Sequence, residues 1–139
     1  MTAKLKITAD MLREHDACQD QVDLFEEVFP NGAVVPDDIE KAGKAGLATG
    51  WAFKVFKLTG VAERWYENGQ QWYRWEYRNG KRHGVYEGWH ANGQQSYRRE
   101  YRDDKRHGVA ERWYANGQQW YRWEYRDGKL IRNLMEEDK

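Results

Sequence analysis

GVAERWYENGQQWYRWEYRNGKRH (residues 60–83) is followed directly by GVYEGWHANGQQSYRREYRDDKRH (84–107) and GVAERWYANGQQWYRWEYRDGKLI (108–131). The three segments align without gaps at a period of 24 residues, and the first agrees with the third at 20 of 24 positions and with the second at 16. A fixed period of this length indicates a repeat architecture, in which each copy packs mainly against its neighbours. Residues 60–131 are therefore expected to form one continuous repeat array.

Each copy contains two turn signals. The first set is Asn68-Gly69, Asn92-Gly93 and Asn116-Gly117, and the second set is Asn79-Gly80, Asp103-Asp104 and Asp127-Gly128. Asn-Gly and Asp-Gly favour the positive φ angles of two-residue type I′ hairpin turns. The pattern predicts strands near 61–66, 71–78, 85–90, 95–102, 109–114 and 119–126, with WAFKVFKL (51–58) as a leading strand and 129–132 as a short closing strand. The predicted array is a single-layer antiparallel β-meander.

Counting outward from a two-residue turn at Asn68-Gly69 gives the register and sorts the side chains into two faces. Ala62 then lies opposite Trp75, and Trp65 lies opposite Trp72. Face one carries Val61, Glu63, Trp65, Trp72, Arg74, Glu76 and their repeat equivalents. Face two carries Ala62, Arg64, Tyr66, Tyr73, Trp75, Tyr77 and their repeat equivalents.

Comparison of the copies points to face two as the binding surface. On face one only Trp72/Ser96/Trp120 differs, whereas on face two the middle copy has Tyr86, Gly88, His90 and Arg99 in place of Ala, Arg, Tyr and Trp. Tyr86 opposite Arg99 is expected to form a cation–π pair that replaces a small–large pair. The predicted partner-binding residues are Tyr73, Trp75, Tyr86, His90, Tyr97, Arg99, Tyr121 and Trp123. The alternative is that these positions have drifted and have no specific role.

The pattern G-x-x-x-x-W-Y-x-N-G-Q…E-Y-x-[ND]-G-K-x-x-G resembles the bacterial variant of the MORN repeat over about residues 60–130. Asp104 departs from it, since glycine is expected there. The resemblance implies a binding module of the antitoxin or immunity type, with no catalytic residues to carry over. The stretch LREHDACQDQVDLFEEVFPNGAVV (12–35) is similar to leaders of uncharacterised phage and prophage proteins, which implies no mechanism.

The first 48 residues are predicted to be helical. Thr8 is expected to cap a helix over Ala9 to Glu14, and Asp16 one running to Phe29 with Cys18, Val22, Phe25 and Phe29 as its apolar stripe. Pro36 suits the first turn of a third helix through about Ala45. This head could cover the open edge of the meander. Its exposed acids Asp20, Asp23, Glu26 and Glu27 form a candidate second partner surface, although a solvated helix face is the commoner role.

The predicted fold class is thus α+β, with an acidic helical region (1–48), a β-repeat array (49–132) and an acidic tail (133–139). Residues 1–48 carry five Lys/Arg against ten Asp/Glu, whereas 49–132 carry seventeen against ten. A mean hydropathy of -1.12 beside 15% aromatic residues suits a thin sheet with half-buried rings. One cysteine, Cys18, allows no internal disulfide, and no long apolar stretch is present, so we expect a cytoplasmic protein without membrane contact.

Catalytic, metal and cofactor sites are not expected. Equivalent residues of neighbouring copies lie two strands apart, about 9 to 10 Å, which is too far to share a metal ion. The sole serine, Ser96, points away from His90 in this register, and Glu76 opposite His83 is more typical of a cross-strand charge pair than of acid–base catalysis. Phosphate-binding glycine loops are absent from the sequence.

The sequence therefore predicts a non-catalytic module that occludes a bacterial protein, such as a toxin or a defence component, as an antitoxin-like or phage-encoded inhibitor. Tyr, Trp and Arg dominate binding hot spots, and a preformed sheet holds them at little ordering cost. Binding of single-stranded nucleic acid is the alternative, because Arg interleaved with Tyr and Trp also suits backbone attraction and base stacking. A lipid surface is less favoured, since the sequence has no apolar wedge or lysine cluster.

Overall fold

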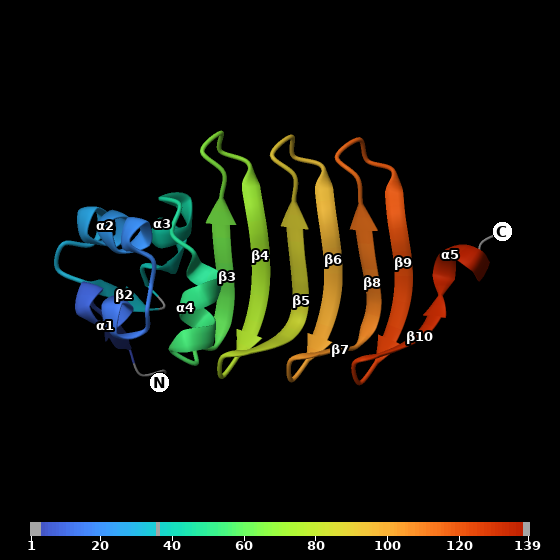
Figure 1. The fold of residues 1–139 in the computed structure, drawn as a ribbon, viewed down its shortest axis with the longest axis horizontal. Coiled ribbons are helices and arrows are strands. Elements are labelled where there is room, and N and C mark those ends of the chain that lie inside the picture. Colours follow the sequence, from blue (N-terminus) through green and yellow to red (C-terminus); the bar gives the residue numbers. More distant parts are fainter. Residues whose placement is uncertain (1–3, 36, 138–139) are drawn as a thin grey trace.

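The computed structural model describes residues 4–35 and 37–137 and shows a short helical head followed by a long antiparallel sheet (Figure 1). The head lies at one end of the row of strands, and α5 lies at the other end (Figure 1). The fold is α+β, as the sequence predicts.

The helices are α1 (Ala9–Glu14), α2 (Gln19–Val28), α3 (Ile39–Lys44), α4 (Thr49–Val55) and α5 (Leu134–Glu137). The strands are β1 (Leu5–Ile7), β2 (Ala33–Val35), β3 (Gly60–Trp65), β4 (Gln71–Arg78), β5 (Lys81–Trp89), β6 (Gln95–Arg102), β7 (Lys105–Arg106), β8 (Gly108–Trp113), β9 (Gln119–Arg126) and β10 (Lys129–Asn133). The main sheet has the order β10-β9-β8-β6-β5-β4-β3, with β7 paired to β6. Neighbours in sequence are neighbours in the sheet, so the repeats form the predicted meander.

The structure of the head agrees only in part with the helices and caps predicted from its sequence. The Thr8 hydroxyl accepts a hydrogen bond from the Met11 amide and caps α1, as predicted. Asp16 does not cap α2: its φ is 61°, and α2 begins after Cys18, which makes no side-chain capping bond. The third helix begins at Ile39, three residues later than predicted. An unpredicted two-stranded ladder of β1 and β2 joins the two ends of the α1–α2 segment.

The apolar side chains of α2 form the centre of the head core. Val22, Phe25 and Phe29 are buried and pack with Ile7, Leu12 and Leu47. Cys18 was predicted in the same stripe, but it is exposed, because it lies before the first turn of the helix. Burial of these side chains supplies most of the stability that such short helices lack on their own.

The second set of turns has the predicted type I′ conformation. Asn79 and Gly80 have φ angles of 50° and 79°, and Asp103 and Asp104 have 48° and 69°. Each turn is also tied to the segment before its own copy. The Gly80 amide donates to the carbonyl of Leu58, which precedes the first copy, and the Asp104 amide donates to the Arg82 carbonyl of the first copy.

The first set of turns differs from the prediction. In the first copy the Gly69 amide donates to the Tyr66 carbonyl and the Tyr66 amide donates to Gln70, so the loop is a three-residue turn with positive φ at Gly69 only. The register holds from Ala62 opposite Trp75 to Arg64 opposite Tyr73, and then shifts so that Trp65 pairs with Gln71. Trp65 opposite Trp72 was therefore wrong, because Trp72 is the extra residue of a β-bulge.

WAFKVFKL is not a leading strand. Residues 49–55 form α4, and Leu58 follows it with its amide bonded to the Phe53 carbonyl. Phe53 is only 1% exposed and contacts Tyr77 with ring centroids 5.5 Å apart. A short apolar run fits either a strand or a buried helix, and contact with the sheet decides for the helix here.

The head covers the β3 edge of the sheet, as the sequence suggested. The Thr49 hydroxyl donates to the outward-facing carbonyl of Glu63 at 2.6 Å. A Cβ at Gly43 would overlap that same carbonyl, so glycine allows α3 to approach the edge closely. Lys44 lies over the Trp65 ring at 5.6 Å. The edge strand is thus protected from pairing with other chains.

Candidate binding face

The β-bulges place one strand position of each copy on face two, although the sequence had assigned it to face one. Trp72 stacks on Tyr66 with ring centroids 4.9 Å apart and lies under the Arg64 guanidinium, and both partners belong to face two. Gln71 takes its place on face one, where its amide donates to Glu63. Ser96 and Trp120 are the bulged residues of the other copies. Every strand position that distinguishes the middle copy from the first therefore lies on face two.

Face one is a repeated polar network that holds the strands together. Gln71, Gln95 and Gln119 donate to Glu63, Glu87 and Glu111 in the three copies. Glu76 accepts from the Val85 amide, and Glu100 accepts from the Val109 amide at 3.2 Å. Glu76 is thus committed to the backbone rather than to an acid–base pair with His83. The Gln–Glu bonds join the two strands of one copy, and the bonds of Glu76 and Glu100 join one copy to the next.

Face two is filled by an aromatic ladder. Trp75 lies between Tyr73 and Tyr86, with ring centroids 3.6 Å and 4.3 Å away and planes nearly parallel. In the third copy Tyr121 stacks on Trp123 at 4.0 Å. The small residues at the bases of these stacks, Ala62 and Ala110, are 0% and 2% exposed.

Helix α4 covers the ladder at its N-terminal end. The Gly50 amide donates to the Tyr73 hydroxyl at 3.0 Å, and Phe53 packs on Tyr77. Tyr73 is only 4% exposed, so it offers no surface to a partner while α4 is in place. Apart from Trp72 of the first copy, the part of face two that remains uncovered belongs to the second and third copies.

The middle copy is packed differently from the sequence prediction. The Tyr97 ring lies over Gly88, where a Cβ would come within 2.5 Å of it, and its hydroxyl accepts from the Trp75 indole at 2.8 Å. Tyr86 does pair with Arg99 in register, but the Arg99 guanidinium lies over Tyr97, at 4.9 Å, and Tyr86 stacks on Trp75. The predicted cation–π pair therefore has a different ring.

Burial raises the pKa values of two tyrosines in this ladder, Tyr97 and Tyr86. Removal from water raises the pKa of Tyr97 to about 12, and the indole N–H of Trp75 partly opposes this shift. Burial also raises the pKa of Tyr86 well above its ordinary value, as does its hydrogen bond with Tyr77. Both phenols stay neutral at physiological pH and act as hydrogen-bonding and stacking groups.

Arginine–aromatic clusters occupy the outer part of face two. Arg112 lies 4.8 Å over Trp120, which stacks on Tyr114 at 5.1 Å, and Trp120 and Tyr114 are 49% and 46% exposed. The first copy repeats this cluster, with Trp72 at 38% exposure. The sheet contains five such cation–ring pairs, formed by Arg64, Arg82, Arg99, Arg106 and Arg112.

The charge of face two is almost wholly positive. All acidic residues within strands β3 to β10 lie on face one, namely Glu63, Glu76, Glu87, Glu100, Glu111 and Glu124. Over residues 4–35 and 37–137, no carboxylate is within ion-pair distance of Arg64, Arg99 or Arg112. The Nε atoms of Arg64 and Arg99 are buried without a hydrogen-bond partner.

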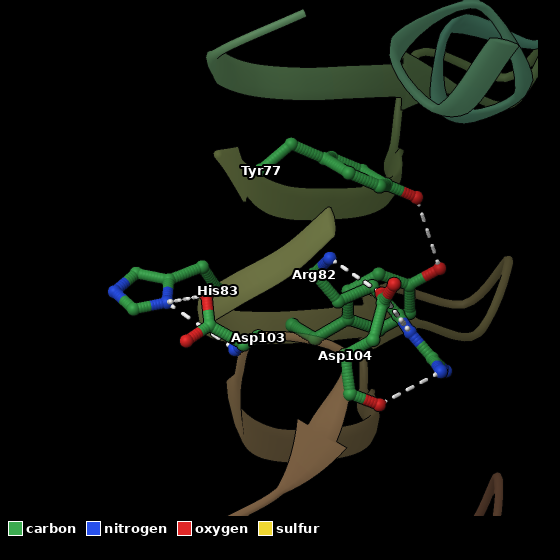
Figure 2. Close-up of polar contacts among 6 residues, drawn as sticks. Tyr77, Arg82, His83, Asp103 and Asp104 are labelled. Carbon is green, nitrogen blue, oxygen red and sulfur yellow. Dashed lines mark hydrogen bonds and ion pairs between the residues drawn. The ribbon is translucent and has the colours of Figure 1, made fainter. Parts of the chain in front are cut away.

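Asp104 is the exception at the rim of this face. It stands where the repeat has glycine, and its carboxylate accepts from the Arg82 amide at 2.8 Å and from Arg82 Nε at 3.2 Å. Figure 2 shows this pair beside His83, whose Nδ1 accepts a long bond of 3.4 Å from the Asp103 amide. Asp104 thus neutralises the charge of Arg82. The interaction also offsets part of the strain of the left-handed backbone conformation of Asp104.

The remaining predicted residues have identifiable places. His90 Nε2 is hydrogen-bonded to the Trp113 carbonyl oxygen at 3.0 Å. At the equivalent position of the first copy, the Tyr66 hydroxyl donates to the Trp89 carbonyl. The His90 ring therefore joins adjacent copies. Tyr121 and Trp123 are half-buried beside the Arg112 cluster. The four acids lie exposed on α2, in the head and away from the second and third copies (Figure 1): Asp20, Asp23, Glu26 and Glu27.

Sequence reasoning placed Arg112 and Tyr114 on face two but left them out of the predicted partner-binding residues, and it placed the exposed Trp120 on face one. The signal was present, because Trp72 and Trp120 become Ser96 in the middle copy, at the one varying position that had been assigned to face one. The error came from the bulge, which the assumed two-residue turn did not include.

Two segments of the chain match a known repeat family. Residues 58–79 and 106–127 match the model for the MORN repeat variant, while all but the last two residues of the middle copy (84–107) lie outside both matches. MORN repeats are commonly protein- or membrane-binding modules, and proteins built from them are generally non-catalytic. No curated protein and no solved structure matches the chain.

Two further findings concern the described residues. Across 4–35 and 37–137, no helix has the length and apolar character needed to cross a bilayer. In the same residues, His, Cys, Asp and Glu side chains form no group of three or more that could hold a metal ion.

Proposed function

We propose that this chain is a non-catalytic protein-binding module that occludes an acidic surface of its partner, as an antitoxin-like or phage-encoded inhibitor would. The binding surface in this proposal is the uncovered part of face two, centred on Arg99, Arg112, Tyr114 and Trp120. The observation that carries the proposal is the row of arginines stacked on aromatic rings, among which Arg64, Arg99 and Arg112 have no carboxylate partner within residues 4–35 and 37–137.

The geometry favours a preformed surface over an adaptable one. Each guanidinium is held against a ring, and the rings are held by neighbouring rings, so little side-chain freedom is lost on binding. A desolvated guanidinium on an aromatic face also binds carboxylates more strongly than a freely hydrated lysine does. An acidic protein surface would satisfy the exposed N–H groups, and the exposed indole of Trp120 would add apolar contact area.

Single-stranded nucleic acid is the second candidate, and the exposed Trp72 and Trp120 favour it. A base can stack on an exposed ring while its phosphates meet the arginines. A complex with nucleic acid should weaken steeply with added salt and disappear after nuclease treatment, whereas a protein complex should survive nuclease.

The test is an affinity pull-down from nuclease-treated bacterial lysate with the wild type and two charge-matched double variants. Arg99→Glu/Arg112→Glu changes face two, and Arg102→Glu/Arg126→Glu changes exposed strand ends by the same charge in the same two copies. We expect the wild type and the control to retain one acidic protein in stoichiometric amount and the face-two variant to lose it. Equal loss in both variants would refute a face-specific contact, and circular dichroism would verify that both remain folded.

The acids of α2 are proposed as a second, independent contact with a basic partner surface. Asp23 accepts from Gln19 and Glu26 pairs with Arg13, so only Asp20 and Glu27 lack a side-chain partner in the described structure. Retention of the captured protein by Asp20→Asn/Glu27→Gln at wild-type level would refute this second contact.

A further inference from the structure

An apolar cavity lies within the helical part of the chain, where all of its lining residues fall between Ile7 and Leu58. Its volume is about 330 Å³, and it is lined by side chains from α1 to α4 and from both core clusters. Alanines contribute much of the lining and leave the space open: Ala17, Ala33, Ala42, Ala48 and Ala52. The cavity is therefore a property of this packing arrangement, in which small residues face one another.

The polar groups of the lining are already engaged within the protein. Gln21 accepts from the Ala48 amide at 2.8 Å, Asp38 accepts from the Val34 amide at 2.7 Å, and Thr49 donates to the Glu63 carbonyl. These groups are thus turned to protein partners, and the rest of the lining is mostly apolar. Apolar cavities of this kind stay dry or take apolar guests.

Two lining residues, Asp16 and Cys18, are exposed and so mark the mouth of the cavity. The carboxylate at the mouth disfavours an anionic ligand, because like charges repel across a low-dielectric opening. A neutral molecule meets no such penalty.

We propose that this cavity binds a neutral, apolar small molecule, such as a medium-chain alcohol. A cavity of about 150 Å³ accepts benzene, so one of this size suits a molecule of about eight to ten non-hydrogen atoms. Trp51, Ala52 and Phe53 of α4 line the cavity, and α4 is the helix that covers Tyr73. A bound molecule would therefore add contacts between the head and the helix that docks on the sheet. This proposal does not depend on the proposed function of face two.

The test is calorimetric titration of the full chain with 1-octanol and, separately, with octanoate. Two alanines on α3 form a matched pair: Ala42 lines the cavity, whereas Ala45, three residues later, is exposed and outside it. We expect the wild type and Ala45→Leu to bind one 1-octanol and to bind octanoate at least tenfold more weakly. We expect Ala42→Leu to fill the space, to lose at least tenfold in affinity, and to melt at or above the wild-type temperature.

A second filling variant, Ala17→Leu, approaches the space from the α1–α2 side and should behave as Ala42→Leu does. Absence of saturable 1-octanol binding to the wild type would overturn the proposal. So would wild-type affinity in both filling variants, or equal binding of octanoate. If neither filling variant folded, the cavity would have no room for a leucine side chain. That result would also contradict the proposal.

Discussion

Gly50→Ala tests how closely α4 docks on face two. Gly50 is the second residue of α4, and alanine in a helix normally stabilises it by up to about 1 kcal/mol relative to glycine. Here the added Cβ would overlap the Cζ3 and Cε3 atoms of Trp75. The ring cannot move aside easily, since Tyr73 and Tyr86 stack on its two faces and its indole N–H is bonded to Tyr97.

Overpacking of this kind costs about 1–3 kcal/mol, and the clamped ring places Gly50→Ala near the upper end. After the helix gain is subtracted, we expect a net loss of about 2 kcal/mol, which corresponds to a melting temperature roughly 5 °C lower. Urea unfolding followed by far-UV circular dichroism measures the free energy directly.

A double-mutant cycle with Trp75→Ala separates the clash from other effects. Without the ring, Gly50→Ala should be neutral or stabilising by up to about 1 kcal/mol. Stabilisation by Gly50→Ala in the wild-type background would refute the close contact between α4 and the aromatic ladder.

Three further predictions concern stability. Thr49→Val should lower the free energy of unfolding in urea by about 1–3 kcal/mol, because it leaves the Glu63 carbonyl at the sheet edge without its hydrogen-bond donor. A loss below about 0.5 kcal/mol would contradict a stabilising role for this hydrogen bond. Asp104→Ala should be more destabilising than Asp104→Gly by about 1 kcal/mol, since both lose the pair with Arg82 but only alanine is strained at a φ of 69°; the reverse order in thermal melts would refute this. Because burial raises the pKa of Tyr97 to about 12 from 10.0, its contribution to stability should be fully present below pH 10 and be lost as pH rises through 12; the unfolding free energy of Tyr97→Phe should fall less over that window.

The repeat period and the chemistry of the second turns made most of the sheet predictable. Two successive residues with positive φ are demanded by a type I′ turn, and Asn79-Gly80 and Asp127-Gly128 supply them. The Asn68-Gly69 turn looks alike in sequence but closes a three-residue loop, in which Asn68 accepts from the Gln70 amide. Local sequence did not distinguish these turns, because the difference lies in the bulge at Trp72.

The sequence predicted which side of the sheet carries the candidate site, but it did not predict which of those residues are exposed. Alternation placed Tyr73 and Tyr97 correctly on face two. Their burial depends on a helix from outside the repeats and on the loss of a side chain at Gly88, and neither is a local property. The assignment of WAFKVFKL to a strand failed for the same reason, since Phe53 is buried by contact with Tyr77 rather than by a strand neighbour.

Binding through face two is tested by comparing two tryptophans of the third copy. Trp120 lies exposed on face two and Trp113 lies on face one, so Trp120→Ala and Trp113→Ala make the same chemical change on opposite sides of the sheet. The measurement is the Kd of each variant for the captured partner protein. We predict at least a tenfold rise for Trp120→Ala, or about 1.4 kcal/mol, and less than a threefold rise for Trp113→Ala. An equal rise for both variants, or a larger one for Trp113→Ala, would contradict binding through face two.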